Sequence, residues 1–370
     1  MKLILSTPKT VFSVGPSRYR ILCIGETWLG SDARAIFSAF RRLGNSVQVL
    51  DENHYVSIYS NTFISRGLRK ILKPFFVTDL KLNALKMISS FKPQCVFVFK
   101  GSWVHPDIIA SCREQNIKSL NYYPDVSFLS HGRYLPRTLP LYDHIFTAKS
   151  YGVEDMKTHL GVTQASFLPP GYDPELHQPL ELSEEDRSLY GCDVAFIGMW
   201  SAKKERLLRS LKDAVPKLNL RIWGPGWERA TSSLLAESIM GRVVTGDEYT
   251  KAIRGAAICL GLLSESGKGS SSGDLITART FQIPACRTFM LHERNTEVLD
   301  FFDEGLEAAF FDGPEELAEK IHYYLDHAEE REMIAGNGHA RCLQGEYAVD
   351  GRARTMLRWL DSQLNGHSVD

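Results

Sequence analysis

The stretch that decides the fold runs from residue 19 to residue 50 and reads YRILCIGETWLGSDARAIFSAFRRLGNSVQVL. The apolar run Ile21–Ile24 is followed by a glycine-containing turn and then by Asp32–Leu43, whose apolar residues recur at helical spacing. Gly44 ends that helix, and Val47–Leu50 follows as a second apolar run. A short buried strand, an amphipathic helix and another buried strand predict one unit of a parallel sheet covered on both faces.

The same alternation continues along both halves of the chain. In the first half, further strands are expected at Cys95–Phe99, Ile117–Asn121 and His144–Thr147. In the second half, strands are expected at Val194–Ile197, Leu220–Trp223, Ala256–Leu262 and Phe289–Leu291. The two series predict an α/β protein of two doubly wound domains that face each other across a cleft, with the ligand at the carboxyl ends of the strands.

A proline-rich stretch, residues 168–179, separates the two series and is followed by the acidic run Glu181–Asp186. Proline density and the change in composition are typical of a linker. We therefore expect an N-terminal domain over residues 1–178, a C-terminal domain over residues 192–346, and a helix over residues 347–370 that returns to the N-terminal domain.

Composition excludes several classes of protein. The 370 residues contain 43 Lys+Arg and 44 Asp+Glu, a net charge of −1, which argues against binding nucleic acid by backbone electrostatics. No apolar stretch reaches the roughly 20 residues that span a bilayer, and Met1–Ser6 is too short for the apolar core of a signal peptide. Seven scattered cysteines without a CxxC pair indicate reduced, packed thiols. We expect a cytoplasmic protein without a transmembrane segment.

Two segments of the first half are candidates for the cleft. Gly25–Gly30 lacks the glycine pattern of a dinucleotide loop and the lysine of a Walker A loop, so it is either a plain strand-to-helix turn or an acceptor-binding loop. Asp125 ends a predicted strand and His131 follows it. Either side chain could accept a proton from a substrate hydroxyl. The competing interpretations are a turn-capping aspartate and an ordinary loop histidine.

Two segments of the second half are candidates for an anion site. Lys203 and Lys204 begin the helix after the first strand, where a cation can neutralise a departing phosphate; a solvated helix face is the alternative. Ser264–Gly273 reads SESGKGSSSG and precedes Asp274–Phe281, an expected helix beginning. Free backbone N–H groups beside a helix N-terminus suit a diphosphate. The alternative is a disordered surface loop.

The chain reads DLITARTFQIPAC from residue 274, FDEG at 302–305 and FDGPEELAEKIHYYL at 311–325. These segments resemble the C-terminal domain of the CgeB-like (spore-maturation-type) glycosyltransferases of the retaining GT-B clan. Tyr142–Thr147 and Leu168–Pro174 resemble the segment by which that clan enters its hinge. The resemblance implies two Rossmann-like domains, with a nucleotide-diphosphate sugar held by the C-terminal domain, an acceptor presented by the N-terminal one, and no metal.

The resemblance also implies roles for single residues. The E-x7-E motif of related retaining enzymes corresponds here to Asp274 and Gln282, one near the donor sugar at a helix N-terminus and the other near the ribose. Arg279 lies in the same helix and is implied to be a phosphate-binding or structural arginine, and the loop around Gly246 resembles the loop that contacts the base. The expected catalytic residues are Asp274, Asp125 and His131, and the expected donor-binding residues are Lys203, Lys204, Gly246, Ser271, Gly273, Arg279 and Gln282.

We expect a retaining, metal-independent glycosyltransferase of the hexosyltransferase type. Its co-substrate is a nucleotide sugar, with UDP-sugar favoured; no other cofactor is expected, and the acceptor is a glycan, a protein or a small molecule. Neutral Gln282 in place of the family's glutamate supports a second hypothesis, a catalytically silent GT-B binding or scaffolding subunit. A nucleotide-sugar epimerase of the same build is a third, without a motif of its own.

Overall fold

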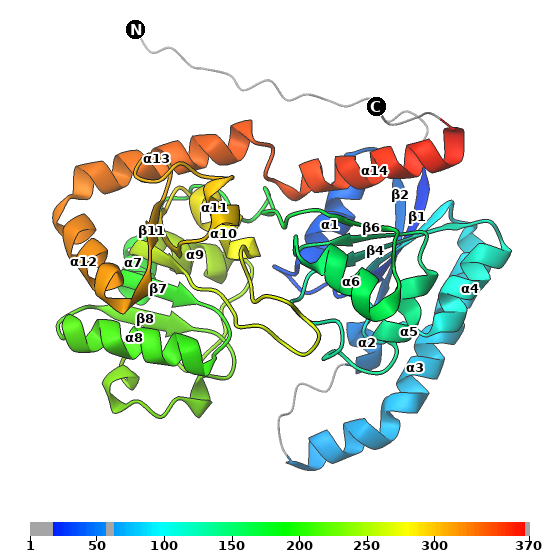
Figure 1. Cartoon of the computed structure of the whole chain (residues 1–370), viewed down its shortest axis with the longest axis horizontal. Helices are drawn as coiled ribbons and strands as arrows, with labels where there is room; N and C mark the ends of the chain where they lie inside the picture. The colour runs from blue at the N-terminus through cyan, green and yellow to red at the C-terminus, as the bar shows by residue number, and fades with distance from the viewer. Residues whose placement is uncertain (1–17, 57–62, 367–370) are drawn as a thin grey trace, which may run out of the picture.

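The computed structural model describes residues 18–56 and 63–366. Two α/β domains lie side by side in it, with the N-terminal domain on the right of Figure 1. The segment Met1–Ser6 and the last four residues of the expected C-terminal helix lie outside the described residues. The predicted fold class, two parallel α/β domains, is confirmed.

The N-terminal domain is built on a parallel sheet that has six strands within the described residues, in the order β2-β1-β3-β4-β5-β6. The strands are β1 (Arg20–Gly25), β2 (Ser46–Asp51), β3 (Cys95–Phe99), β4 (Lys118–Tyr123), β5 (His144–Thr147) and β6 (Ala165–Phe167). The helices are α1 (Asp32–Arg42), α2 (Asn53–Val56), α3 (Phe63–Phe91), α4 (Pro106–Glu114), α5 (Leu135–Thr138) and α6 (Gly152–Leu160), with a 3₁₀ turn at Leu139–Leu141. Since β1 lies between β2 and β3, the strand order reverses there and leaves a crevice at the carboxyl ends.

The C-terminal domain has a second parallel sheet, with five strands among the described residues in the order β11-β10-β9-β7-β8. Its strands are β7 (Cys192–Ile197), β8 (Leu220–Trp223), β9 (Ala256–Gly261), β10 (Phe289–Glu293) and β11 (Ala309–Phe311). Its helices are α7 (Glu184–Tyr190), α8 (Ala202–Ala214), α9 (Asp247–Gly255), α10 (Ala278–Ala285), α11 (Thr296–Leu299), α12 (Gly313–Asp326) and α13 (Ala328–Gln344), with 3₁₀ turns at Trp227–Arg229 and Ser233–Leu235.

Strand β1 shows why the apolar runs are continuous rather than alternating. Ile21 and Cys23 belong to the core layer that contains α1, whereas Leu22 and Ile24 belong to the layer that contains α3 and α4. Successive side chains of a strand point to opposite faces, so a sheet covered on both faces requires apolar residues at every position.

The chain crosses between the domains twice, and the two crossings are hydrogen-bonded to each other. The Tyr172 N–H donates to the Tyr347 carbonyl over 3.2 Å, and the Val349 N–H donates to the Tyr172 carbonyl over 2.9 Å. The acidic run expected in the linker only partly belongs to it, because Ser183 caps α7 and Glu184 is the first residue of that helix. Acidic side chains in the first turn of a helix are stabilised by its dipole.

Helix α14 (Val349–Asn365) follows the second crossing and lies along α1 of the N-terminal domain (Figure 1). Met356, Leu357 and Leu360 are buried in the same core layer as α1 and one face of β1. The Asp350 carboxylate accepts two hydrogen bonds from the Arg42 guanidinium, at 2.7 and 2.9 Å. The last helix of the chain is therefore part of the first domain's core.

Two further properties concern the sequence expectations about membranes and thiols. Across residues 18–56 and 63–366, no helix combines the length and the apolar character that crossing a bilayer requires. All seven cysteines are free thiols and six of them are buried.

The sequence analysis did not identify α3, which contains Pro74 in its interior.

We expect Leu360→Ala to lower the free energy of unfolding by about 2–5 kcal/mol, because the substitution leaves a cavity in a closed core layer. Leu360 is 1% exposed, whereas Leu364, one turn later on the same helix, is 36% exposed. Leu364→Ala is the matched control and should cost about 1 kcal/mol or less. Urea unfolding measures both; equal effects would contradict the docking of α14.

Candidate functional site

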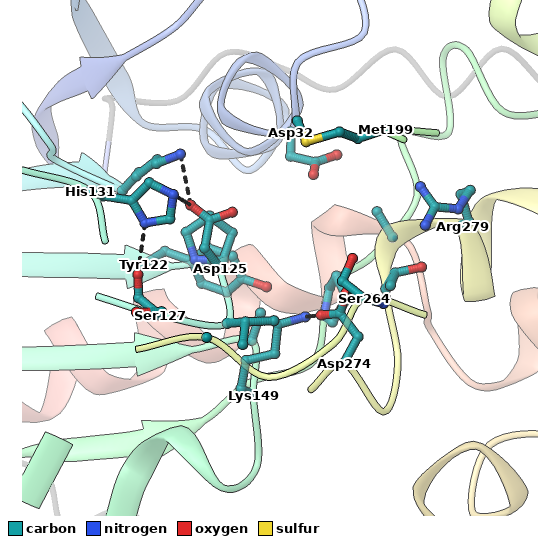
Figure 2. Close-up of a pocket in the computed structure, with 18 of the residues that line it drawn as sticks. Asp32, Tyr122, Asp125, Ser127, His131, Lys149, Met199, Ser264, Asp274 and Arg279 are labelled. Carbon is teal, nitrogen blue, oxygen red and sulfur yellow. Dashed lines mark hydrogen bonds and ion pairs between the residues drawn. The ribbon is translucent and has the colours of Figure 1, made fainter. Parts of the chain in front are cut away.

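A cavity of about 520 Å³ opens between the two domains at the carboxyl ends of both sheets (Figure 2). The N-terminal domain contributes side chains that follow β1, β3, β4 and β5, among them Asp32, Lys100, Asp125, His131 and Lys149. The C-terminal domain contributes side chains that follow β7 and β9, among them Met199, Lys204, Ser264, Asp274 and Arg279. The cavity therefore brings together five of the ten residues selected from the sequence: Asp125, His131, Lys204, Asp274 and Arg279.

A buried ion pair crosses the floor of this cavity. Lys149 Nζ of the N-terminal domain lies 2.5 Å from Asp274 Oδ1 of the C-terminal domain and also donates to the Ile276 carbonyl over 3.1 Å. The Ser264 N–H donates to the other carboxylate oxygen over 3.2 Å. Burial by itself raises the pKa of Asp274, but Lys149, the Ser264 hydrogen bond and Arg279 outweigh it and hold the pKa below its usual value. Asp274 is therefore ionised at neutral pH.

Lys204 is a buried cation at the cavity wall. It lies in the first turn of α8 and is 2% exposed. Its Nζ donates to two neutral acceptors, Ser264 Oγ at 3.1 Å and the Met199 carbonyl at 3.4 Å. Burial, and after it the nearby Arg279 guanidinium, lower the pKa of Lys204 to about 8. The charges of Asp274 and Glu293 act in the opposite direction but do not outweigh burial.

Arg279 is the second cation of the same wall. It is the second residue of α10, and its Nη2 donates to the Leu262 carbonyl over 3.1 Å. Its guanidinium lies against Gly198, where a Cβ would come within 3.0 Å of Nη1, so the position after β7 must stay small. Arg279 and Lys204 both face the ring of Phe196, at 5.6 and 5.8 Å from its centroid.

Neither Lys204 nor Arg279 has a carboxylate within ion-pair distance, 4.0 Å, among the described residues. Arg279 Nε also lacks a hydrogen-bond partner there. Two adjacent cations in a low-dielectric cavity repel each other and are stabilised by an anion that bridges them. The wall formed by Lys204 and Arg279 is therefore suited to a phosphate or diphosphate group.

A second polar cluster occupies the opposite, N-terminal side of the cavity. Asp125 Oδ2 lies 2.7 Å from Lys100 Nζ and 3.6 Å from His131 Nε2. His131 Nδ1 lies 2.8 Å from the Ser127 carbonyl and 2.9 Å from the Tyr123 hydroxyl. Because a carbonyl only accepts hydrogen bonds, the contact with Ser127 places a proton on Nδ1 and leaves Nε2 on the side of Asp125. The cluster can therefore accept a proton on the side of the cavity opposite the cations.

The cavity also contains charged residues that the sequence analysis did not select: Asp32, Lys100, Lys149, Glu265 and Arg352. Asp32 and Arg279 reach into the cavity from opposite domains (Figure 2). Burial, followed by the negative charges of Asp173 and Asp125, raises the pKa of Asp32 to about 6. Lys100 and Lys149 follow the predicted strands Cys95–Phe99 and His144–Thr147 closely, so a search for polar residues just after each strand would have found them.

Two of the expected donor-binding side chains have other partners. Lys203 Nζ is paired with the Glu293 carboxylate and donates to the Leu263 carbonyl, so its charge is neutralised away from the cavity. Gln282 is buried, and its Oε1 accepts a hydrogen bond from the Tyr249 hydroxyl over 2.7 Å. Neither lines the cavity. To bind a nucleotide-sugar donor, Lys203 would have to leave Glu293, and Gln282 would have to leave the Tyr249 hydroxyl.

The expected helix beginning at Asp274 is wrong. Helix α10 begins at Ala278, because Thr277 and Thr280 form a capping box at that point. Asp274 precedes the helix by a turn of loop, and its carboxylate is positioned by Lys149 and the Ser264 N–H instead of by a helix dipole.

The Ser264–Gly273 loop, a candidate diphosphate site, lines the cavity at Ser264 and Gly267 and reaches the N-terminal domain (Figure 1). The Ser271 N–H donates to Asp155 Oδ2 over 2.9 Å, and the Lys268 carbonyl accepts from the Ser127 hydroxyl. At Gly273 a Cβ would lie 2.3 Å from the Ser264 carbonyl oxygen, so this glycine permits a close chain crossing.

Gly246, selected for contact with a base, precedes α9 with a φ of +55°. A Cβ there would lie 2.6 Å from the Leu29 side chain of the N-terminal domain. It lies outside the described lining of the cavity. Among the described residues, no group of three or more His, Cys, Asp or Glu is arranged to hold a metal ion.

Two parallel-sheet domains that face each other across a cleft have the architecture of the GT-B class of fold. Solved structures agree. A glycosyltransferase from Rickettsia africae ESF-5 matches at TM-score 0.64 and 12% identity, over 94% of this chain and 99% of that one. A sucrose-phosphate synthase from Thermosynechococcus elongatus matches at TM-score 0.64 and 14% identity, over 95% of this chain and 100% of that one. Anabaena HepE in complex with UDP-glucose matches at TM-score 0.62 and 10% identity, over 93% of this chain and 100% of that one. At these identities the likeness shows the fold alone.

The sequence itself matches one family model, described as glycosyl transferase-like, over residues 203–358. This segment is somewhat less than half of the chain and contains Lys204, Asp274 and Arg279. No curated protein sequence matches the chain.

Removing one partner of the Lys149–Asp274 pair should be strongly destabilising. We expect Lys149→Met to lower the free energy of unfolding by about 3–5 kcal/mol, because it leaves the Asp274 charge buried and unpaired. The double variant Lys149→Met/Asp274→Leu should recover most of the loss. Lys157→Met, which breaks an exposed pair, is the control and should cost less than about 1 kcal/mol. Additive losses in the double variant, measured by urea unfolding, would contradict the pairing.

The affinity for a nucleoside diphosphate should fall at alkaline pH. Burial lowers the pKa of Lys204 in the free protein to about 8. The anion binds the protonated lysine. Above pH 8, therefore, Lys204 must take up a proton when the anion binds, which weakens the apparent affinity. We expect the Kd of UDP, whose phosphates are already ionised above pH 7, to rise roughly tenfold per pH unit above pH 8. Titration calorimetry measures it. Lys204→Arg keeps its charge and should remove the rise; an unchanged slope would refute the assignment.

Proposed function

We propose that this protein is a glycosyltransferase that takes a nucleotide-diphosphate sugar, with UDP-sugar favoured, into the cavity between its domains. The observation that carries the proposal is the pair of cations, Lys204 and Arg279, that face the cavity without a carboxylate within 4.0 Å among the described residues. The glycosyl transferase-like match over residues 203–358 supports it, since it includes both residues. The UDP-glucose complex of HepE supports UDP-glucose as a first donor to test.

The proposed chemistry uses the cations to stabilise the leaving group. As the bond between the sugar and the diphosphate lengthens, negative charge grows on the diphosphate oxygen. Lys204 and Arg279 are in place beforehand, so no reorganisation is needed at that moment. Because these side chains supply the positive charge, the proposed reaction requires no metal ion. Ionised Asp274 beside them accepts hydrogen bonds from hydroxyls of the donor sugar.

The acceptor is proposed to enter from the N-terminal side. Its hydroxyl attacks the sugar on the face that the diphosphate leaves, so the configuration of the sugar is retained. The hydroxyl proton passes to the leaving diphosphate, and Asp125 and His131 orient the acceptor at the N-terminal wall. The resemblance of residues 274–282 to the retaining clan supports this stereochemistry and the proposed place of the protein among the CgeB-like enzymes. The free, mostly buried cysteines support the proposed cytoplasmic location.

A second candidate function is a catalytically silent binding or scaffolding subunit. The observation that favours it is Gln282, whose amide oxygen is already bonded to the Tyr249 hydroxyl. Such a subunit would bind UDP through Lys204 and Arg279 but release no product. Binding and turnover must therefore be measured separately.

We expect UDP-sugars to raise the melting temperature and the wild-type protein to release UDP from at least one of them. Arg279→Ala should lower kcat/KM by about 10²-fold or more, because it removes a charge that stabilises the leaving group. Arg209→Ala, an exposed arginine on the outer part of α8, is the matched control and should leave the rate unchanged.

Each outcome separates the hypotheses. A melting shift without UDP release from any donor supports the silent subunit. No shift with any nucleotide sugar or nucleoside diphosphate refutes both. Retention is tested by NMR of the product, where an anomeric configuration opposite to that of the donor would overturn the proposed stereochemistry.

A further inference from the structure

A smaller cavity of about 220 Å³ lies wholly within the N-terminal domain, at the carboxyl ends of its strands. Its lining comes from the segments that follow β1, β2, β3 and β4, including Gly30, Glu52, Phe99 and Pro124. It shares Asp32, Lys100, Pro124 and Asp125 with the main cavity. A group bound here would therefore belong to a molecule that extends into the main cavity from the acceptor side. We refer to it as the side pocket.

The side pocket has an aromatic wall. Trp28 is 40% exposed, and its Nε1–H donates to Glu26 Oε2 over 2.7 Å, which fixes the orientation of the indole. An exposed indole of fixed orientation offers its face to an apolar or cationic group. The loop Gly25–Gly30 thus contributes recognition features to the N-terminal side of the cleft.

The charge of the side pocket is unbalanced. Its lining holds four carboxyl groups, Glu26, Asp32, Glu52 and Asp125, and one cation, Lys100. Lys100 lies 2.7 Å from Asp125 and is neutralised by it. Among the described residues, no cation lies within 4.0 Å of the other three carboxyl groups.

Glu52 is the least satisfied of these groups. It is 6% exposed, and its Oε1 has no hydrogen-bond partner among the described residues. Burial, and after it the charge of Glu26, raise the pKa of Glu52 to about 8; Lys100 opposes this shift and Asp51 adds to it. A buried acceptor without a donor costs free energy, which a ligand that supplies the donor recovers.

We propose that the side pocket binds a protonated amine of the acceptor substrate, so that the acceptor is an amino sugar or another amino alcohol. This inference rests on the proposed glycosyltransferase function. An ammonium group supplies up to three donors and one positive charge, which match the carboxyl groups of Glu26, Asp32 and Glu52 and favour the ionised form of Glu52, and it is attracted to the face of Trp28. A neutral polyol would supply hydrogen bonds but leave the negative charge uncompensated.

The position of the side pocket suits this role. Asp32 and Asp125 line both cavities, so an amine held at Glu52 leaves the remainder of the acceptor at the N-terminal wall of the main cavity. A hydroxyl there faces the wall that carries Lys204 and Arg279. The two walls then divide the substrates by charge: the anionic donor lies on one side and the cationic acceptor on the other.

The experiment compares glucosamine with N-acetylglucosamine and glucose, which share the ring but lack the positive charge. We expect glucosamine to bind the UDP-loaded protein at pH 7 at least tenfold more tightly, measured by NMR titration. Glu52→Gln keeps the shape but removes the negative charge that Glu52 acquires when an ammonium group binds beside it, and should weaken glucosamine about tenfold while leaving the Kd of UDP unchanged. Glu26→Gln, on an exposed residue of the same pocket, is a second variant should Glu52→Gln not fold.

Glu114→Gln is the matched control, because it removes the same charge from an exposed position at the end of α4. It should change neither affinity. Equal affinity for the three sugars, no binding of glucosamine at 10 mM or about that concentration, or unchanged glucosamine binding in the side-pocket variants would overturn the amine proposal. UDP binding and UDP release from the donor are measured in the same samples. They can remain intact when the amine proposal fails, so the two failures are distinguishable.

Discussion

The rest of the site depends on one buried ion pair, Lys149 with Asp274, because it joins the two domains at the floor of the cavity. Two charges removed from water are stable only while they stay paired and hydrogen-bonded. The Ser264 N–H donates to the Asp274 carboxylate, and the Ile276 carbonyl accepts from Lys149. The ion pair therefore holds the chain both before and after Asp274. Any opening of the cleft that separates Lys149 from Asp274 must bring water or a ligand to both charges.

A net charge of −1 does not prevent an anion site in a cleft, because local charge decides binding there. Lys149 is paired with Asp274 and Lys100 with Asp125, whereas other charges of the cleft have no ion-pair partner within 4.0 Å among the described residues. These include the cations Lys204 and Arg279 on the C-terminal side, and the carboxyl groups of the side pocket other than Asp125 on the N-terminal side. Each wall is buried enough that its field is weakly screened, so a few residues suffice.

The elements of the fold were largely predictable, because continuous apolar strands such as His144–Thr147 and Leu220–Trp223 follow directly from burial on both faces. The long helix α3 was missed, since Pro74 interrupts its pattern. In the site, Lys204 was selected from its place at a helix start and Arg279 from the family resemblance, and both line the cavity. The partner of Asp274 was not, because Lys149 lies 125 residues earlier and meets it only when the domains face each other. The misplaced start of α10 came from reading Asp274 as a helix beginning, although Thr277 and Thr280 carried the capping signal.

The docking of α14 on α1 has a consequence for the order of synthesis. A ribosome makes the N-terminal sheet before the C-terminal domain, but the residues that cover one face of that sheet, Met356, Leu357 and Leu360, are made after the C-terminal domain. Until then, the apolar face of α1 is open to solvent and to other nascent chains. The C-terminal domain can be complete before the N-terminal one closes. The N-terminal domain thus begins before the C-terminal domain along the chain but completes its core only after it.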